Sequence, residues 1–372
     1  MEAKLYTIAV ESYSRALILK TLLEEENISS VLMNVNTIQP DASGGVKVKV
    51  TEDDLEKAMK IASRMKLDMK PEEESVKKPL KILVPVDFSD YSRNAVRYAL
   101  GIAKNYQGSK LLLLHIYYTP DIGTIPYSES YIFSDPVSEQ ITEIKEAAIT
   151  QMKYFKESIS KELNKLGLEN IDLETLLIPG LPSDTILNYS EDFQPDLLVI
   201  GARGAGLRSE FMGGSSVRVV MKSNFPVLVV PEDSKFHYDK KEYNILYATN
   251  YDESDFLAIT RLMNLLAGFR IRIYCVHVGK GEMDKWAKLK MDGLKKYFVD
   301  SYPRVKLICS VINNDDVLAG LETYLDKHNV DMISLTTHRR NLLTSLIHPS
   351  LTKKIIFQSN LPMLVFHTDM NV

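Results

Sequence analysis

The sequence DLLVIGARGAGLRSEFMGGSSVRVVMKSNFPVLVVP occupies residues 196–231 and predicts the core of an α/β domain. An apolar run at 197–200 is typical of a buried parallel strand, and a second apolar run at 227–230 follows Pro226. Between the two runs, small residues recur with the spacing glycine-x2-glycine-x9-glycine-serine-serine: Gly201, Gly204, Gly214, Ser215 and Ser216. The valines that come next have helical spacing, so we expect a strand, a loop, a helix and a second strand.

These glycines and serines lie where a strand passes into a helix, and that position predicts an anion site. Glycine lets the backbone approach a ligand closely, and the first amides of a helix have no partner within the helix. Those amides can therefore face a phosphate group. The sequence predicts a phosphate cradle at this junction.

Composition limits the classes of protein to consider. The chain has 372 residues, 45% of them hydrophobic and 25% charged, which is an ordinary globular composition with length for two or three domains. A net charge of -4 argues against a nucleic-acid surface, because phosphate backbones are bound by clustered lysine and arginine. Residues 1–15 lack a basic region followed by an apolar core, and no apolar run approaches the length of about 18 residues that spans a membrane. We expect a soluble, cytoplasmic protein that binds neither nucleic acid nor membrane.

Cys275 and Cys309 are the only cysteines of the chain. Both fall in apolar, strand-like runs. Buried free thiols are favoured over a disulfide at such positions.

Residues 1–68 form a predicted unit with the order β-α-β-β-α, and the charged, proline-bracketed residues 69–79 predict a linker. Residues 13–26 and 53–65 have the spacing of amphipathic helices. Strands are expected at three apolar segments: 5–10, 31–35 and 46–50. With the phrase GVKVKVTEDDLEKA, the unit resembles a small signal-transducing domain of ferredoxin-like type. Its role stays open between a packing or oligomerisation module and a regulatory ligand site.

A doubly wound domain is predicted over residues 80–231. The phrase KILVPVDFSDYSRNAVRYALGIAKNYQGSKLLLLHIYY predicts strands at 82–86 and 111–116, and Ser89 or Asp90 can cap the helix between them. Such a strand, helix, strand crossover implies parallel pairing with a right-handed connection. Ligands of these sheets bind beyond the carboxyl ends of the strands, where the strand order reverses.

Asp87 follows the first of these strands, at the expected ligand edge. Two roles are compatible with this position. The carboxylate can cap the next helix, or it can contact the adenine or ribose of a nucleotide held by the glycine loop.

The glycine-serine spacing resembles the nucleotide-binding signature of the universal stress protein family. PVDFS, which contains Val86 and Asp87, and HIY, which contains Ile116, match the first-strand and second-strand landmarks of that family. The resemblance implies that ATP or another adenine nucleotide binds with its base near these three residues and its phosphates on the cradle, and it favours the ligand role of Asp87. A Mg2+ ion is expected to accompany a triphosphate without a dedicated protein cage. Arg203 or Arg208 either screens phosphate charge or is simply solvated.

A long segment without clear periodicity, residues 117–137, lies near this site in the chain. It holds four tyrosines and three prolines. Long loops beside a site are often lids, and a solvent-exposed insertion is the equal alternative. A helix over 139–166 and a strand over 173–178 are expected next, and Ser183 is a candidate cap of the following helix.

The chain then repeats this domain. The phrase NILYATNYDESDFLAITRLMNLLAGFRIRIYCVHV at 244–278 retraces the first crossover, and 331–366 retraces the cradle and the last strand. The clearest anchors are two similar tails, SNFPVLVV at 223–230 and SNLPMLVF at 359–366. The chain therefore divides into two repeats and a linker: 80–231, 244–368 and, between them, 232–243.

The two repeats differ at the predicted site. Each residue of the first repeat corresponds to one of the second in these pairs: Gly201 and Thr336, Gly204 and Arg339, Gly214 and approximately Ser350, Asp87 and Asn250. Side chains at the glycine positions crowd the backbone against a phosphate. We expect the second repeat to have lost the nucleotide site.

The family resemblance also implies how the repeats meet. The last strands, 227–230 and 363–366, are expected to pair antiparallel across an internal pseudo-twofold axis, which covers two sheet edges. The expected fold class is α/β, with two tandem doubly wound parallel five-stranded sheets of the adenine nucleotide alpha-hydrolase-like type, preceded by the small α+β domain. Further homodimerisation and a protein partner are left open.

The leading functional hypothesis is a nucleotide-binding regulatory protein of the stress response, not an enzyme. The chain has no GxxxxGK[ST] loop, and no serine, histidine and acid trio stands out. A slow ATPase or phosphotransferase is one alternative, with Asp87 as the sole candidate base at the wrong end of the ligand. The other alternative is an interaction scaffold that binds no nucleotide.

Overall fold

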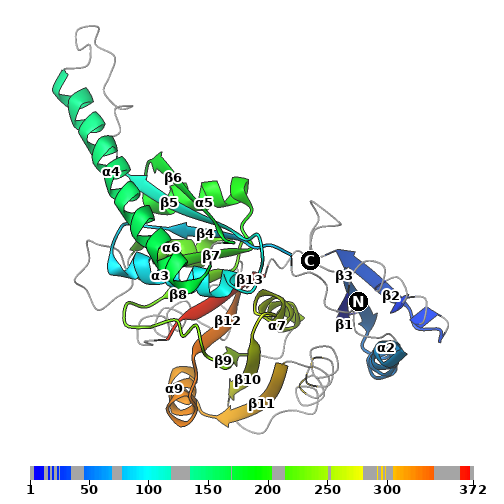
Figure 1. The fold of residues 1–372 in the computed structure, drawn as a ribbon. Helices are drawn as coiled ribbons and strands as arrows, with labels where there is room; N and C mark the ends of the chain where they lie inside the picture. Colours follow the sequence, from blue (N-terminus) through cyan, green and yellow to red (C-terminus); the bar gives the residue numbers. More distant parts are fainter. Residues whose placement is uncertain are drawn as a thin grey trace.

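In the part of the chain that it describes, the computed structural model contains two sheets, one of three strands and one of ten (Figure 1). The structure describes these residues: 4–11, 16, 19–20, 23–24, 26–34, 46–68, 78–118, 135–168, 170–202, 214–249, 253–279, 291, 295, 298, 305–338 and 361–368. Most of the predicted lid-like segment, 119–134, lies outside them.

The smaller sheet belongs to the amino-terminal unit. Its strands β1 (Leu5–Glu11), β3 (Val46–Thr51) and β2 (Ser30–Asn34) pair antiparallel in the order β1-β3-β2. Along β3, buried residues alternate with half-buried ones, as expected for a sheet with one face on a core. Helix α2 (Leu55–Asp68) contributes buried Leu55 and other apolar residues to that core. The predicted strands and second helix are confirmed, and the ferredoxin-like type stays a prediction.

The first half of the large sheet is parallel throughout. Strand β4 (Lys81–Pro85) lies between β5 (Lys110–Tyr117) and β7 (Leu197–Gly201), with β6 (Asp172–Pro179) beyond β5 and β8 (Val227–Val230) beyond β7. The chain moves outward from β4 through β5 to β6 and then returns to the other side of β4. The strand order therefore reverses at β4, and the carboxyl end of this strand is the place where doubly wound sheets bind ligands.

The second half repeats this order. Its strands are β9 (Glu242–Ala248), β10 (Arg270–Gly279), β11 (Val305–Asn313), β12 (Met332–His338) and β13 (Met363–Thr368). In space they run β11-β10-β9-β12-β13, with β9 in the place of β4. The predicted repetition of strand order is present in the structure.

An aspartate before the fourth strand of each half makes the same two hydrogen bonds. The amide of Asp196 donates to the Lys81 carbonyl, and its Oδ2 accepts from the Lys81 amide, both at 2.8 Å. Asp331 makes the same pair of bonds to the backbone of Asn244, also at 2.8 Å. The two halves therefore share bonds that sequence periodicity does not reveal.

The two halves join through their last strands. β13 pairs antiparallel with β8, which confirms the predicted arrangement of these strands; the registered pairs are Met363 with Val229, Leu364 with Leu228, and Val365 with Val227. The two expected five-stranded sheets are therefore halves of one continuous ten-stranded sheet. Each last strand gains a second neighbour, so neither one is an exposed edge.

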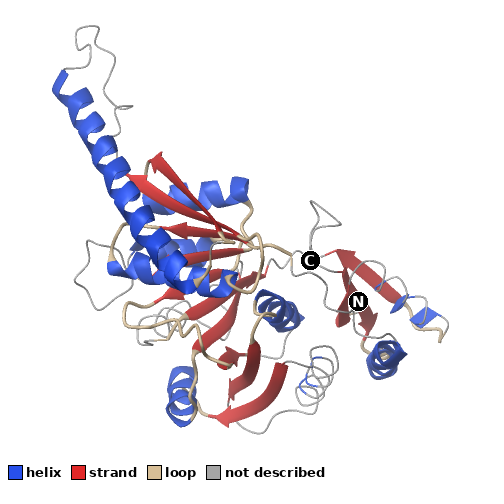
Figure 2. Cartoon of the chain, viewed as in Figure 1, coloured by secondary structure: helices blue, strands red, loops and turns tan. Residues whose placement is uncertain are grey.

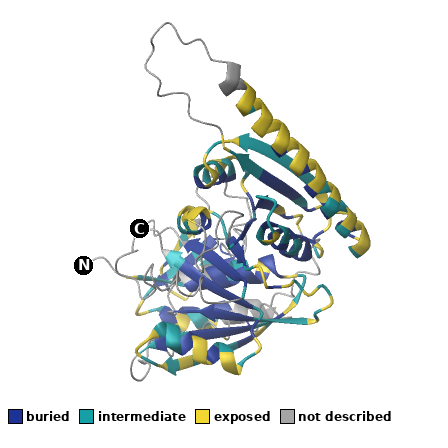
Figure 3. Ribbon diagram, turned by 90° about the vertical axis from the view of Figure 1, so that its left-hand side faces the viewer, coloured by how far each residue is buried: buried dark blue, intermediate teal, exposed yellow. Residues whose placement is uncertain are grey.

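Helices cover both faces of the large sheet (Figure 2). One core cluster joins the strands to residues of α3 (Asp90–Ala103), α4 (Asp135–Leu166) and α7 (Glu253–Leu265). The other joins the strands to α5 (Pro182–Phe193), α6 (Gly214–Lys222) and α9 (Val317–Lys327). Figure 3 shows the buried strands between these layers and the exposed outer face of α4. Each cluster contains residues of both halves, so the apolar core is continuous across the β8–β13 junction.

The segment 232–243, predicted to be a linker, packs closely on α3. The Asn94 side-chain amide donates to the backbone carbonyls of Pro231 at 3.0 Å and Glu232 at 2.7 Å. A Cβ atom at Gly101 would lie 2.2 Å from the ring of Phe236, so glycine is needed for this approach. The segment is therefore part of the interface between the halves.

Two local predictions need correction. Helix α5 begins with Pro182 after Leu181, and no side-chain cap is present, so Ser183 lies inside the helix instead of capping it. Proline at the first position explains this start because it has no amide to satisfy. Helix α4 begins at Asp135 instead of 139.

Candidate functional site

The end of β7 and the start of α6 meet at the junction predicted to be a phosphate cradle. Gly201 is the buried last residue of β7, and α6 begins at Gly214. The Ser216 hydroxyl donates a hydrogen bond to the Gly201 carbonyl at 2.9 Å, and Ser216 is itself buried. Ser216 thus fastens the first turn of α6 to the strand, while Gly214 and Ser215 remain exposed.

The electrostatics of α6 favour an anion at this end. Its first turn contains no acidic side chain, and Lys222 lies in its last turn. The partial positive charge of the helix amino terminus is therefore not neutralised by a carboxylate of the helix itself. Exposed amides at such a terminus are suited to bind phosphate.

Asp87 lies at the carboxyl end of β4, next to this junction. Its Oδ1 accepts hydrogen bonds from the Ser89 amide at 3.1 Å and the Ser89 hydroxyl at 2.5 Å. Ser89 is the N-cap of α3 and accepts from the Ser92 amide at 3.3 Å. Ser89 therefore caps α3, and Asp87 holds the Ser89 side chain in place.

Strand register places the remaining described residues at the same edge. β4 and β7 pair Ile82 with Leu197, and the same offset brings Val86 level with Gly201. β5 pairs Leu114 with Pro85, so Ile116 lies two residues beyond this pair, as Asp87 does. The carboxyl edge thus collects these predicted site residues: Val86, Asp87, Ile116, Gly201, Gly214, Ser215 and Ser216. Arg203 and Gly204 lie outside the described residues.

Phe88 and His115 also belong to this edge, although the sequence did not single them out as site residues. Phe88 has a φ of 65°, a left-handed conformation that is strained for a bulky residue. Its ring centroid lies 4.3 Å from that of His115, and His115 Nδ1 lies 2.8 Å from the Val86 carbonyl oxygen. Burial lowers the pKa of His115 below its ordinary value of 6.5, which favours a neutral ring that donates from Nδ1. No sequence pattern predicts a left-handed phenylalanine.

The corresponding edge of the second repeat contains a buried polar network instead. The Tyr247 hydroxyl lies 2.6 Å from Thr336 Oγ1 and donates to Asp255 Oδ1 at 2.8 Å. Thr249 donates to the other carboxylate oxygen at 2.6 Å. Thr336 pairs with Phe366 as Gly201 pairs with Val230, which agrees with the predicted correspondence of the two positions. The second repeat thus has a hydroxyl side chain at the strand position where the first repeat has glycine.

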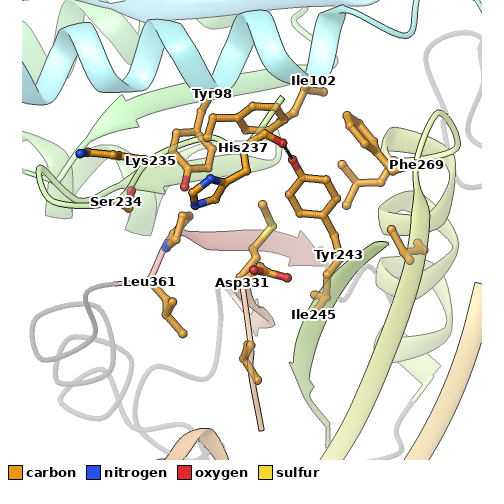
Figure 4. A pocket seen from close by; sticks show the side chains of 16 residues that line it. Tyr98, Ile102, Ser234, Lys235, His237, Tyr243, Ile245, Phe269, Asp331 and Leu361 are labelled. Carbon is orange, nitrogen blue, oxygen red and sulfur yellow. Dashed lines mark hydrogen bonds between the residues drawn. The ribbon is translucent and has the colours of Figure 1, made fainter. Parts of the chain in front are cut away.

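A cavity of about 150 Å³ lies elsewhere, between α3, the segment 232–243 and the strands of the second half (Figure 4). Tyr98, Tyr243 and Asp331 are among its lining residues, and Tyr243 donates to the His237 carbonyl at 2.5 Å. None of the predicted site residues that the structure describes lines this cavity. It is a feature of the interface between the halves and not of the glycine-serine junction.

Two further findings concern the described residues only. No group of three or more histidine, cysteine, aspartate or glutamate side chains among them is arranged to hold a metal ion. No helix in this part of the chain combines the length and apolar character that crossing a membrane requires.

The doubly wound fold and the glycine-serine junction at its switch point define a class of α/β proteins suited to phosphate-bearing ligands. The model of the universal stress protein family matches residues 80–231. The universal stress protein YxiE of Bacillus subtilis is 30% identical over 152 residues, which cover 40% of this chain and 97% of that protein. A universal stress protein of Methanocaldococcus jannaschii is 28% identical over 156 residues, covering 42% of this chain and 84% of that protein.

A solved structure has the same fold over a longer range. The crystal structure of a universal stress protein from Archaeoglobus fulgidus covers 79% of this chain and 98% of its own, with a TM-score of 0.56 and 20% sequence identity. The present chain belongs to the universal stress protein family.

Proposed function

We propose that this chain is a regulatory protein that binds one ATP or other adenine nucleotide in its first repeat. The observation that carries the proposal is the 2.9 Å bond from Ser216 to the Gly201 carbonyl. It holds the amino terminus of α6 at the point where the strand order reverses, beside Asp87. Membership of the universal stress protein family supports the adenine nucleotide as the ligand.

In this proposal the two ends of the nucleotide contact different residues. The base and ribose lie near Val86, Asp87 and Ile116. The phosphates lie on the glycine-serine segment: Gly201, Arg203, Gly204, Gly214, Ser215 and Ser216. A Mg2+ ion would accompany a triphosphate and be held by the phosphates.

The second repeat is proposed to pack against the first without binding nucleotide, so that one chain has the form of a dimer. Its network of Tyr247, Asp255 and Thr336 supports this, since the hydroxyl and carboxylate groups already satisfy one another. The proposed boundaries are 80–231 and 244–368 for the repeats and 1–68 for the amino-terminal unit.

Binding without turnover is favoured over hydrolysis. Asp87 is the sole acidic candidate for a general base among the proposed site residues, and its Oδ1 already accepts two bonds from Ser89. A base at the adenine end is also remote from the terminal phosphate.

Calorimetric titration with ATP and Mg2+, together with an assay for released phosphate, tests the proposal. We expect one site per chain and no turnover above a protein-free control. Binding with steady phosphate release would instead establish an ATPase. If the chain, freed of bound ligand by unfolding and refolding, takes up no adenine nucleotide, the proposal is wrong and the scaffold alternative replaces it.

A further inference from the structure

The two cysteines of the chain are direct cross-strand neighbours. Cys275 lies on β10 and Cys309 on β11, and the parallel register of these strands pairs the two residues with each other. Neither thiol is in a disulfide, as predicted. Cys309 is only half-buried, however, which corrects the expectation that both would be buried. The chain contains no other cysteine, so its whole thiol content is at one place.

The spacing of this pair is compatible with a disulfide. Adjacent strands lie about 4.8 Å apart, and disulfides join Cα atoms separated by roughly 4.4–6.8 Å. Partners in register on neighbouring strands also point to the same face of a sheet. In agreement, both cysteines pack in the core cluster on the α7 face, and the Cys275 thiol is hydrogen-bonded with Cys309.

The surroundings of the two thiols give them different reactivity. Cys275 is fully buried, and this burial raises the pKa of its thiol well above the ordinary value, so it stays protonated. Cys309 is half-buried and lies on β11, which pairs only with β10 among the described strands. Cys309 is therefore the more accessible of the two cysteines, and its strand has no second neighbour among the described strands.

We propose that Cys275 and Cys309 form a reversible disulfide when a hydroperoxide oxidises the protein. The Cys309 sulfur attacks the peroxide oxygen and forms an S–O bond while the O–O bond breaks. The thiol proton passes to the departing oxygen, which leaves as an alcohol or water, and Cys309 becomes a sulfenic acid. The Cys275 sulfur then attacks the Cys309 sulfur, and its proton leaves with the hydroxyl group as water. In total, two thiols and one hydroperoxide give one disulfide, one alcohol or water from the peroxide, and one further water. A dithiol reductant reverses the oxidation.

Hydrogen peroxide treatment of the full chain tests this proposal. Free thiols are blocked by alkylation, the protein is digested without reduction, and the peptides are identified by mass spectrometry. We expect a peptide pair joined through Cys275 and Cys309, lighter than the two free peptides by two hydrogen atoms. Treatment with dithiothreitol after the peroxide and before alkylation should abolish the joined peptides. If peroxide leaves both thiols alkylatable, or takes Cys309 only to sulfinic acid, the proposal is overturned.

Two variants test which thiol is oxidised first and whether the cross-link depends on the strand register. In Cys275→Ser, a sulfenic acid should persist at Cys309 and be trapped by dimedone. A double variant, Cys309→Ser with Ser310→Cys, keeps two thiols but moves one to the neighbouring position, which pairs with Val276. Successive residues of a strand point to opposite faces, so this variant should give no cross-link. A cross-link in the double variant equal to that of the wild type would contradict the dependence on register.

Discussion

Both repeats end their first strand in the same way and differ at the end of the fourth. In each, a histidine Nδ1 lies against a backbone carbonyl, with His115 at 2.8 Å from Val86 O and His277 at 2.9 Å from Thr249 O. The fourth strand, however, carries Gly201 in one repeat and Thr336 in the other. Bonds to the backbone tolerate a change of side chain, so both repeats keep the fold although their fourth strands end in different residues. The proposed nucleotide site, in contrast, depends on the side chains at this edge.

The two edges also satisfy their polar groups differently. In the first repeat the Gly201 carbonyl accepts from Ser216, and no side chain projects from the strand end. In the second, Thr336, Tyr247 and Asp255 hydrogen-bond with one another inside the protein. Buried hydroxyl and carboxylate groups require such partners, so the network needs no ligand to be stable.

The largest expected effect is on nucleotide affinity, when the last residue of the fourth strand in the first repeat is replaced by its counterpart from the second. Gly201→Thr places a branched side chain at the buried end of β7, and a steric cost of about 1–3 kcal/mol in the nucleotide-bound state corresponds to roughly fivefold to 150-fold weaker binding. Calorimetric titration with ATP and Mg2+ measures the change. The reciprocal variant Thr336→Gly is the matched control and should leave the affinity of the first repeat unchanged. A second binding site in that variant would break the comparison.

Removing the carboxylate of the second repeat should destabilise the protein. Asp255→Ala deprives Tyr247 and Thr249 of their buried acceptor, and a buried donor left unsatisfied costs about 1–3 kcal/mol, so the free energy of unfolding should fall by at least that amount. Urea denaturation monitors the loss. Ser92 holds the equivalent helix position in the first repeat, and Ser92→Ala should cost less than half as much. Equal losses would show that the network is no stronger than the single bond that the Ser92 hydroxyl donates to the Ser89 carbonyl at 3.0 Å.

Removing a single oxygen atom, the Tyr106 hydroxyl, should weaken the contact between the repeats. The Tyr106 hydroxyl of the first repeat lies 2.8 Å from the carbonyl oxygens of Asn264 and Leu265 in the second, and burial raises the pKa of Tyr106 to about 12, so the hydroxyl remains a donor. Tyr106→Phe should lower the free energy of unfolding by about 1 kcal/mol. Scanning calorimetry provides the measurement. Tyr154→Phe, at a side chain that is 65% exposed, should change nothing; a similar loss there would refute the role of this contact.

The smallest expected effect is a pH dependence from His115. Its folded pKa lies below 6.5 chiefly because of burial, so the unfolded chain takes up a proton near that pH before the folded chain does. Stability should therefore fall as the pH drops through 6.5 and level off below the folded pKa. The test is urea denaturation of wild type and His115→Gln at several pH values between about 5 and 8. The variant should show the shallower dependence, and identical slopes would contradict the lowered pKa.

Much of this fold follows from local patterns in the sequence. The apolar runs predicted the strands, and the similar tails at 223–230 and 359–366 predicted the repeat, whereas the pairing of the last strands was implied by the family resemblance. The glycine-serine spacing located the strand-to-helix junction that Ser216 holds together. These features can be predicted because backbone sterics and the burial of apolar side chains act over a few neighbouring residues.

The contacts that distinguish the two repeats were decided only by the tertiary structure. Tyr247 and Thr336 are far apart in the sequence, as are Cys275 and Cys309, and nothing in their local sequence indicates that they meet. The left-handed backbone of Phe88 and its ring contact with His115 are likewise visible only in the tertiary structure. Such contacts depend on which strands become neighbours and in which register. Register is set by the whole sheet, because shifting one strand by a single residue moves every one of its side chains to the opposite face.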